Sequence, residues 1–154
     1  MDGVLADMQG YMDEHNIKYN APTEHDEKVD QAMWDELRKV DHFYLHLAPV
    51  PGSIELFENL SEKYNCQILS AEPKKKWNIA NAREDKIEWV KKMLGPEVKA
   101  NICFRPEKKD YVKGKHCILI DDLPQNITEW EEAGGTGILF TDAFSFDYEK
   151  LETE

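Results

Sequence analysis

Two acidic motifs near the ends of this 154-residue chain constrain its fold more than any other feature. The first is the opening run Met1-Asp2-Gly3-Val4-Leu5-Ala6-Asp7, and the second is the pair Asp121-Asp122, which follows the apolar run 117–120. An apolar run that ends in carboxylates is typical of a buried strand that delivers them to the carboxyl edge of a parallel sheet, where open α/β folds place their sites. Carboxylates at that edge suit a divalent cation and phosphate chemistry.

Between the motifs, short apolar runs alternate with longer amphipathic stretches, which indicates βα units and a mainly parallel sheet. Val4 and Leu5 would form only the tail of a first strand. The expected strands cover residues 66–70, 101–104, 116–120 and 137–140, and the expected helices cover residues 24–40, 53–64, 85–94 and 124–133.

Composition excludes several classes of protein. A hydrophobic content of 41% and four Trp exclude a disordered chain. A formal net charge of −12 argues against a nucleic-acid partner, because phosphate contacts need clustered Lys and Arg. No apolar stretch approaches the ~20 residues that a membrane span needs, so no membrane partner is expected. Cys66, Cys103 and Cys117 are odd in number and widely spaced, which is typical of reduced cysteines in a cytoplasmic protein.

Two further candidate site residues, Ser70 and Lys86, lie in that order between the acidic motifs. Ser70 ends the strand-like run 66–69, and Lys86 lies in the helical stretch that Gly95 ends. The order Asp-x-Asp, Ser or Thr, Lys and a second acidic pair resembles that of the haloacid dehalogenase (HAD) superfamily of phosphohydrolases.

The resemblance is closer to the 5'(3')-deoxyribonucleotidase family. The first motif of that family reads Asp-Met-Asp-Gly-Val-Leu-Ala-Asp, which this chain matches letter for letter from Met1. A family stretch Phe-Phe-x-x-Leu-x-Pro-x-Pro-Gly is matched by Phe43-Tyr44-Leu45-His46-Leu47-Ala48-Pro49-Val50-Pro51-Gly52. Asn126 and Gly134-Gly135, which follow the second acidic pair, complete a likeness over roughly residues 1 to 141.

This resemblance implies an α/β fold: a HAD-like Rossmannoid parallel sheet with helices on both faces and a small helical cap inserted after the first motif. Residues 1–9 and 49–154 would form the core. Residues 10–48 would form the cap, which closes over the substrate. Residues 10–48 are rich in charge and interrupt the βα rhythm, as an insertion would.

The resemblance also implies roles for the residues that hold the phosphate and the metal. Asp2 would be the general acid/base, and its backbone carbonyl would touch Mg²⁺. Asp121 and Asp122 would hold the same Mg²⁺, one directly and the other through water or a hydrogen bond, with the choice left open. The phosphate would contact Ser70, Ala71, Lys86 and, by a looser match, Lys109.

The resemblance further implies that aromatic side chains in or beside the cap stack on the nucleobase. Trp34 and Phe43 are the candidates. Aromatic residues at helical spacing are also typical of an ordinary core, and both interpretations stay open. Ala71 occupies a place where some relatives carry a second hydroxyl, which puts one phosphate contact in question.

The position that corresponds to the family's nucleophilic Asp precedes Met1. We expect an apolar strand ending in Asp at that place, and a start assigned too far downstream is the preferred explanation for its absence. A truncated, inactive protein and a strand supplied from elsewhere are the alternatives.

The expected function is that of a cytoplasmic Mg²⁺-dependent phosphatase. It would hydrolyse ribo- or deoxyribonucleoside 5'-monophosphates through an aspartyl-phosphate, and a homodimer is compatible with this hypothesis. The alternatives are a HAD phosphatase for another small phosphoester and a nucleotide- or metal-binding remnant without turnover.

Overall fold

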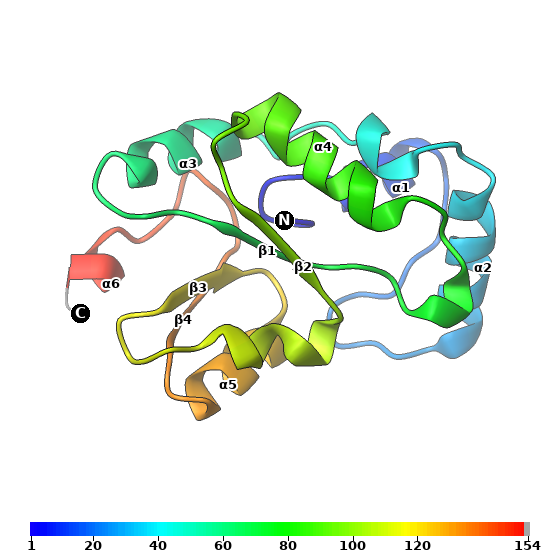
Figure 1. Ribbon diagram of the computed structural model, residues 1–154. Coiled ribbons are helices and arrows are strands. Elements are labelled where there is room, and N and C mark those ends of the chain that lie inside the picture. Colours follow the sequence, from blue (N-terminus) through cyan, green and yellow to red (C-terminus); the bar gives the residue numbers. More distant parts are fainter. Residues whose placement is uncertain (153–154) are drawn as a thin grey trace.

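Four short parallel strands form the centre of the molecule (Figure 1). The structure is a computed structural model and describes residues 1–152. Strand β1 (Ile68–Ala71) pairs in parallel with β2 (Ala100–Cys103), and β3 (Ile118–Asp121) pairs in parallel with β4 (Thr136–Leu139). Each strand lies within two residues of its expected bounds. The predicted α/β fold class of HAD-like parallel strands and covering helices is confirmed.

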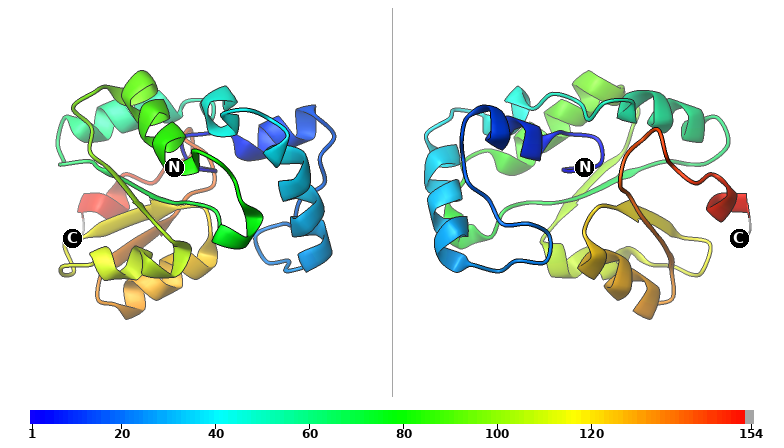
Figure 2. Two further views of the ribbon diagram at one scale, coloured as in Figure 1. Left: turned by 45° about the vertical axis from the view of Figure 1, so that its right-hand side comes forward. Right: turned by 180° about the vertical axis from the view of Figure 1, so that it is seen from behind.

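Helices occupy both sides of these strands, α4 on one side and α5 on the other (Figures 1 and 2). The α-helices are α1 (Met8–Glu14), α2 (Glu27–Arg38), α3 (Ser53–Ser61), α4 (Ala82–Leu94), α5 (Pro124–Glu132) and α6 (Glu149–Glu152). Three short 3₁₀ helices complete the set: η1 (Phe43–His46), η2 (Lys75–Trp77) and η3 (Arg105–Tyr111).

The strands form two separate pairs rather than one sheet. Within residues 1–152, β1 pairs only with β2 and β3 pairs only with β4. The amino group of Met1 is buried close to four charged side chains, those of Lys108, Asp2, Asp121 and Lys86. Burial, followed by the charge of Lys108, lowers the pKa of this amino group to about 6.

The prediction that Val4 and Leu5 end a strand is wrong. They lie in a turn in which the carbonyl of Met1 accepts hydrogen bonds from the backbone N–H groups of Leu5 and Ala6, at 2.8 and 3.0 Å. Gly3 has φ of +79°, a conformation that suits glycine and bends the chain back on itself. Along the first motif, hydrogen bonds within the turn therefore take the place of strand-to-strand hydrogen bonds.

The longest helix, α4, carries the centre of the core. Trp89 and Val90 on this helix are fully buried. The indole Nε1 of Trp89 donates a 2.9 Å hydrogen bond to the carbonyl of Leu47, which fixes α4 against the segment that follows η1. Lys86 lies one turn before Trp89 on the same buried face and is held inside the molecule with it.

Residues 10–48 form a helical arm to one side of the strands (Figure 2). Asp7 accepts a 2.9 Å hydrogen bond from the backbone N–H of Gly10 and begins α1, as a capping residue does. Asp26 caps α2 in the same way, which explains why this helix begins after the expected residue 24. The division into a core of 1–9 and 49–154 and a cap of 10–48 stays a prediction, and residues 153–154 lie outside the described part.

The arm contacts the loop that follows β1. Lys76 in η2 forms a 2.6 Å ion pair with Glu27 in α2, and the rings of Trp34 and Trp77 stack with centroids 6.5 Å apart. Arg38 donates hydrogen bonds to the carbonyl of Trp77. Helix α2 is therefore held beside the loop that extends from Ser70.

Candidate active site

The ammonium of Lys86 in α4 contacts groups from two distant segments, the first motif and strand β1. Its ammonium Nζ donates hydrogen bonds to Asp2 Oδ2 at 2.8 Å, to Ser70 Oγ at 3.0 Å and to the backbone carbonyl of Ala71. The side chain of Lys86 is fully buried, whereas that of Asp2 keeps 27% of its surface exposed. The structure thus brings together four of the residues that sequence analysis placed in the site.

A buried ammonium needs such a set of partners, because an unpaired charge in the interior is costly. Lys86 has three N–H donors, and each has an acceptor. The ring of Tyr44 lies against the same ammonium, with its centroid 4.6 Å from Nζ. The local charge of Lys86 is therefore fixed in place before any ligand arrives.

The second acidic motif lies at the end of β3, as predicted. Asp121 accepts hydrogen bonds from Lys108 Nζ at 2.8 Å, from Asn126 Nδ2 at 3.2 Å and from the backbone N–H of Leu123 at 3.0 Å. Burial acts to raise the pKa of Asp121, but the Lys108 ammonium outweighs it and the pKa is lowered. Asp121 is an ionised carboxylate whose two oxygens both have protein donors.

Asp122 has the opposite environment. Burial, together with the neighbouring charge of Asp121, raises the pKa of Asp122 to about 6. Its carboxylate lies against Gly3, where a Cβ atom would approach Asp122 Oδ2 to 1.9 Å. Gly3 is therefore required for this close approach, and the two acidic motifs meet at this contact.

Two carboxylates remain for a divalent cation, those of Asp2 and Asp122. Asp2 Oδ1 is buried and has no hydrogen-bond partner within residues 1–152, and Asp122 lacks the lysine partner that Asp121 has. No group of three or more His, Cys, Asp or Glu side chains gathers for metal binding in the described part of the chain. Mg²⁺ sites in phosphate chemistry often use only one or two carboxylates, with substrate phosphate and water as the other ligands, so these residues fit that cation.

The other predicted site residues lie farther from this cluster. Lys109 is exposed in η3, and its neighbour Lys108 reaches Asp121 instead. Trp34 is half-buried in α2 and stacks on Trp77. Phe43 is 2% exposed and packs its ring edgewise against Tyr11 and Tyr44.

Sequence analysis missed three residues of this region. Lys108 was passed over for Lys109, because a 3₁₀ turn gives no periodicity from which to choose between adjacent lysines. Trp77 follows a run of three lysines that reads as a solvated loop. Tyr44 lies in the matched stretch 43–52, but only the structure places its ring on Lys86.

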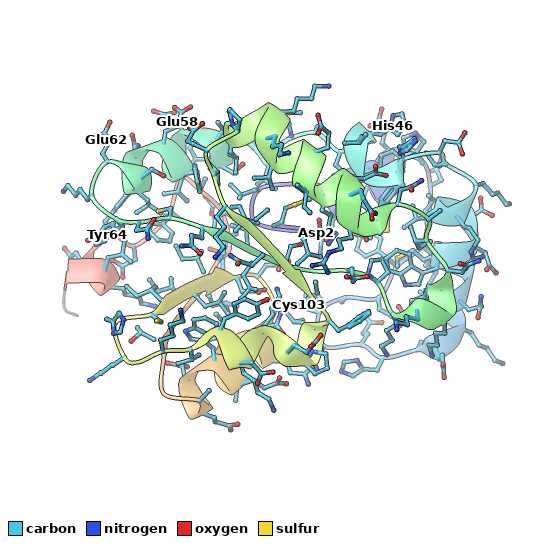
Figure 3. All side chains as sticks on the ribbon, in the orientation of Figure 1. Asp2, His46, Glu58, Glu62, Tyr64 and Cys103 are labelled. Atoms are coloured by element: carbon cyan, nitrogen blue, oxygen red, sulfur yellow. The ribbon has the colours of Figure 1, made fainter. Side chains whose placement is uncertain are left out.

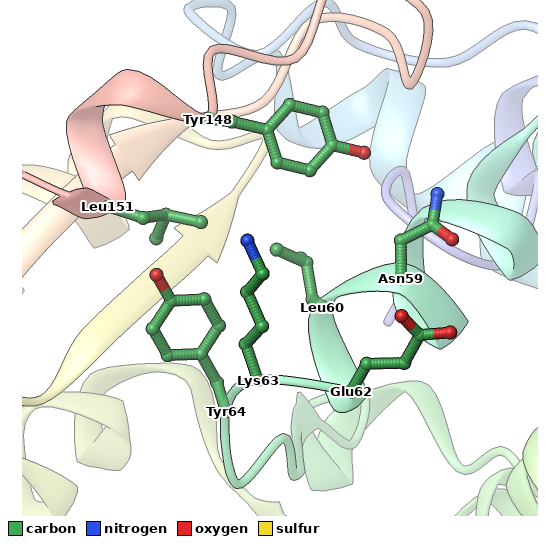
Figure 4. Close-up of a pocket in the computed structure, with 7 residues that line it drawn as sticks. All are labelled: Asn59, Leu60, Glu62, Lys63, Tyr64, Tyr148 and Leu151. Carbon is green, nitrogen blue, oxygen red and sulfur yellow. The ribbon is translucent and has the colours of Figure 1, made fainter.

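A surface hollow lies elsewhere, between the end of α3 and α6 (Figure 4). It is lined by Asn59, Leu60, Glu62, Lys63, Tyr64, Tyr148 and Leu151. Figure 3 shows Asp2 near the centre of the molecule and both Glu62 and Tyr64 at one end. The hollow therefore contributes none of the chemical groups around Lys86 and Asp122.

Strand-end carboxylates, a buried lysine and a hydroxyl lie together on a parallel α/β scaffold, which is the arrangement expected of a HAD-like fold. Over residues 1–152 the chain matches the model of the family described as "5' nucleotidase, deoxy (Pyrimidine), cytosolic type C protein". The chain belongs to this family.

A relative from Vibrio phage KVP40 carries the name "Putative 5'(3')-deoxyribonucleotidase". It is 30% identical over 126 residues, which cover 82% of this chain and 65% of the phage protein. The chain thus spans 65% of the length of this relative. Among residues 1–152, no helix has the length and apolar character needed to cross a membrane.

Proposed function

We propose that the site around Lys86, completed by a nucleophilic Asp before Met1, carries out 5'-nucleotidase chemistry, the Mg²⁺-dependent hydrolysis of ribo- or deoxyribonucleoside 5'-monophosphates in the cytoplasm. The observation that carries the proposal is the convergence of Asp2, Ser70 and the carbonyl of Ala71 on the buried ammonium of Lys86. Family membership supports the reaction class, and the name of the phage relative supports a deoxyribonucleotide substrate.

Each residue has a part that follows from its surroundings. Lys86 holds a positive charge where a phosphoryl group gathers negative charge, and Ser70 offers a hydroxyl beside it. Asp2 keeps Oδ1 without a protein partner, so this oxygen is available to hold a proton at the leaving ester oxygen. The nucleophile would be an Asp immediately before Met1, and the phosphoryl group would be held on it as an aspartyl-phosphate.

Mg²⁺ would be held by Asp122, with Asp2 beside it, and would neutralise charge on the phosphate oxygens when bound. Asp121 would orient this edge rather than bind the ion directly, because Lys108, Asn126 and Leu123 already occupy its oxygens. This assigns the two aspartates different tasks.

Two titrations by calorimetry test the proposal. Mg²⁺ should release or absorb heat with the chain, and thymidine 5'-monophosphate should bind more tightly when Mg²⁺ is present. A variant with Asp121→Asn and Asp122→Asn should lose the Mg²⁺ response, while Asp142→Asn, an exposed control on the loop after β4, should keep it. Identical heats from the double variant and the unchanged chain would exclude this metal site.

A further inference from the structure

Arg105 is linked to the second acidic motif by a path of hydrogen bonds. It is the first residue of η3, and its Nη1 donates hydrogen bonds of 3.2 Å to Asn126 Oδ1 and to Glu129 Oε2 in α5. Asn126 Nδ2 in turn donates to Asp121 Oδ2 at 3.2 Å. The path therefore joins an arginine side chain that is 33% exposed to the buried carboxylate at the end of β3.

The two neighbours of Asn126 are compatible with only one orientation of its side-chain amide. A guanidinium can only donate hydrogen bonds, so the atom that faces Arg105 must be the amide oxygen. The ionised Asp121 can only accept them, so the atom that faces it must be the amide nitrogen. Because Asn126 is 6% exposed, a turned amide would place its oxygen against a carboxylate with little water to separate them. The amide is therefore held from both ends.

Arg105 and Lys108 act on Asp121 from the same short helix. Residues three apart in a 3₁₀ helix lie on one face, and Lys108 Nζ donates to the same Asp121 Oδ2, at 2.8 Å. The backbone N–H of Phe104 donates to Glu107 Oε1 at 2.8 Å, which fixes the first turn of η3. The helix thus directs two cations to one carboxylate oxygen, Lys108 directly and Arg105 through Asn126.

The orientation of Asp121 matters to its neighbour Asp122. Burial is the largest cause of the raised pKa of Asp122, and the charge of Asp121 and a hydrogen bond between the two side chains add to it. The two carboxyl groups are therefore in contact, and a rotation of Asp121 would change the surroundings of Asp122. Under the proposed function Asp122 holds Mg²⁺, so a group that fixes Asp121 also fixes one side of the metal site.

We propose that Arg105 is a positioning residue of this site. It holds the Asn126 amide with its nitrogen toward Asp121, and the fixed Asp121 leaves Asp122 available to Mg²⁺. The inference rests on the proposed function, because it needs Mg²⁺ at Asp122. It goes beyond that function by adding an arginine whose effect on the metal passes through Asn126.

The test measures Mg²⁺ affinity by calorimetry in Arg105→Met and in the matched control Glu129→Gln. Both variants remove the ion pair between η3 and α5, but only Arg105→Met removes the donor to Asn126. Arg105→Met should weaken Mg²⁺ binding roughly 3- to 10-fold, the value of one hydrogen bond. Glu129→Gln should leave the affinity unchanged, and Arg105→Lys, which keeps a cationic donor, should recover part of the loss.

A double-mutant cycle separates this role from a general loss of stability. In the Asn126→Ala background, Arg105→Met should have no further effect on Mg²⁺ affinity, because its path to Asp121 is already broken. Its effect on the melting temperature should persist, because the ion pair with Glu129 does not involve Asn126.

Three results would overturn the inference and leave the proposed function standing. They are an unchanged Mg²⁺ affinity in Arg105→Met, an equal loss of affinity in Glu129→Gln, and an undiminished effect of Arg105→Met in the Asn126→Ala background. Failure of the unchanged chain to bind Mg²⁺ at all would remove both the inference and the proposed metal site.

Discussion

Two buried lysines, Lys86 in α4 and Lys108 in η3, each pair with an aspartate at 2.8 Å, but the two pairs differ in which partner is saturated with hydrogen bonds. In the Lys86 pair, the lysine is the saturated partner, with three acceptors, and Asp2 keeps one oxygen free. In the Lys108 pair, the aspartate is the saturated partner, with three donors on its two oxygens.

This difference indicates which carboxylates are available to bind a proton or a cation. A carboxylate whose oxygens all have donors is stabilised as an ion and held in one orientation, which suits a supporting role. A carboxylate with an unpaired oxygen is poised to bind a proton or a cation. Asp121 belongs to the first kind, and Asp2 belongs to the second.

The largest expected effect on catalytic activity comes from adding the missing nucleophile to the site. A version extended at the N-terminus by an apolar strand that ends in Asp should turn over p-nitrophenyl phosphate orders of magnitude faster than the 154-residue chain, because it supplies a nucleophile between the two lysines. Fixed-time assays with Mg²⁺ measure this turnover rate. The control is the same extension ending in Asn. Equal turnover by the chain and both extended versions would contradict the proposal.

Removing Lys108 should remove the ion pair that stabilises Asp121. Lys108→Met should lower the free energy of unfolding by about 3–5 kcal/mol, because it leaves Asp121 buried without its cation. Urea denaturation measures the loss, and the exposed Lys109→Met should stay within about 0.5 kcal/mol of the unchanged chain. A mild effect of Lys108→Met would mean that Asn126 and Leu123 suffice to hold Asp121.

Trp34 and Phe43 are the aromatic residues predicted to stack on the nucleobase. Substituting them tests whether the site distinguishes nucleotides from other phosphate esters. In the extended version, Trp34→Ala and Phe43→Ala should lower kcat/KM for thymidine monophosphate roughly 5- to 150-fold, the value of one base stacked on an aromatic ring. The rate with p-nitrophenyl phosphate should be spared. Equal losses on both substrates would mean that these rings only support the fold. Phe43 is buried, as a residue with that structural role would be.

The smallest effect concerns pH, and its sign separates the two adjacent aspartates. The pKa of Asp122 is raised from 3.8 to about 6, so the folded chain binds more protons than the unfolded chain between those values. This group should therefore lower the free energy of unfolding by about 1–2 kcal/mol as pH rises through that range. Asp121, whose pKa is lowered, acts in the opposite direction and loses its contribution as pH falls.

Urea denaturation at pH 4.5 and pH 7, without Mg²⁺, gives the measurement for Asp122. Asp122→Asn should be more stable than the unchanged chain at pH 7 and nearly equal to it at pH 4.5. The same difference between the two proteins at both pH values would show that the carboxyl does not titrate in this range.

Much of this arrangement could be predicted from the order of residues. The strands that carry Ser70 and Asp121 at or near their ends were predicted because short apolar runs followed by polar groups are typical of parallel strands. Burial of the runs places those polar groups at an edge of the sheet. The roles of Asp2 and Lys86 depended on a family resemblance, since a single lysine on an amphipathic helix carries no signal of its own. The turn at Val4 and Leu5 was missed because two apolar residues are too short a run to show the period of a strand.

From its local pattern alone, the sequence specified the βα order and the approximate ends of the four strands and of the four longest helices. Local propensity and periodicity act over a few residues, and they suffice for these features. Only the tertiary structure decided that Lys108 rather than Lys109 pairs with Asp121, that Asp122 lies against Gly3, and that Tyr44 covers Lys86. These contacts join residues far apart in the chain, and their energies depend on burial and distance, which no local pattern specifies.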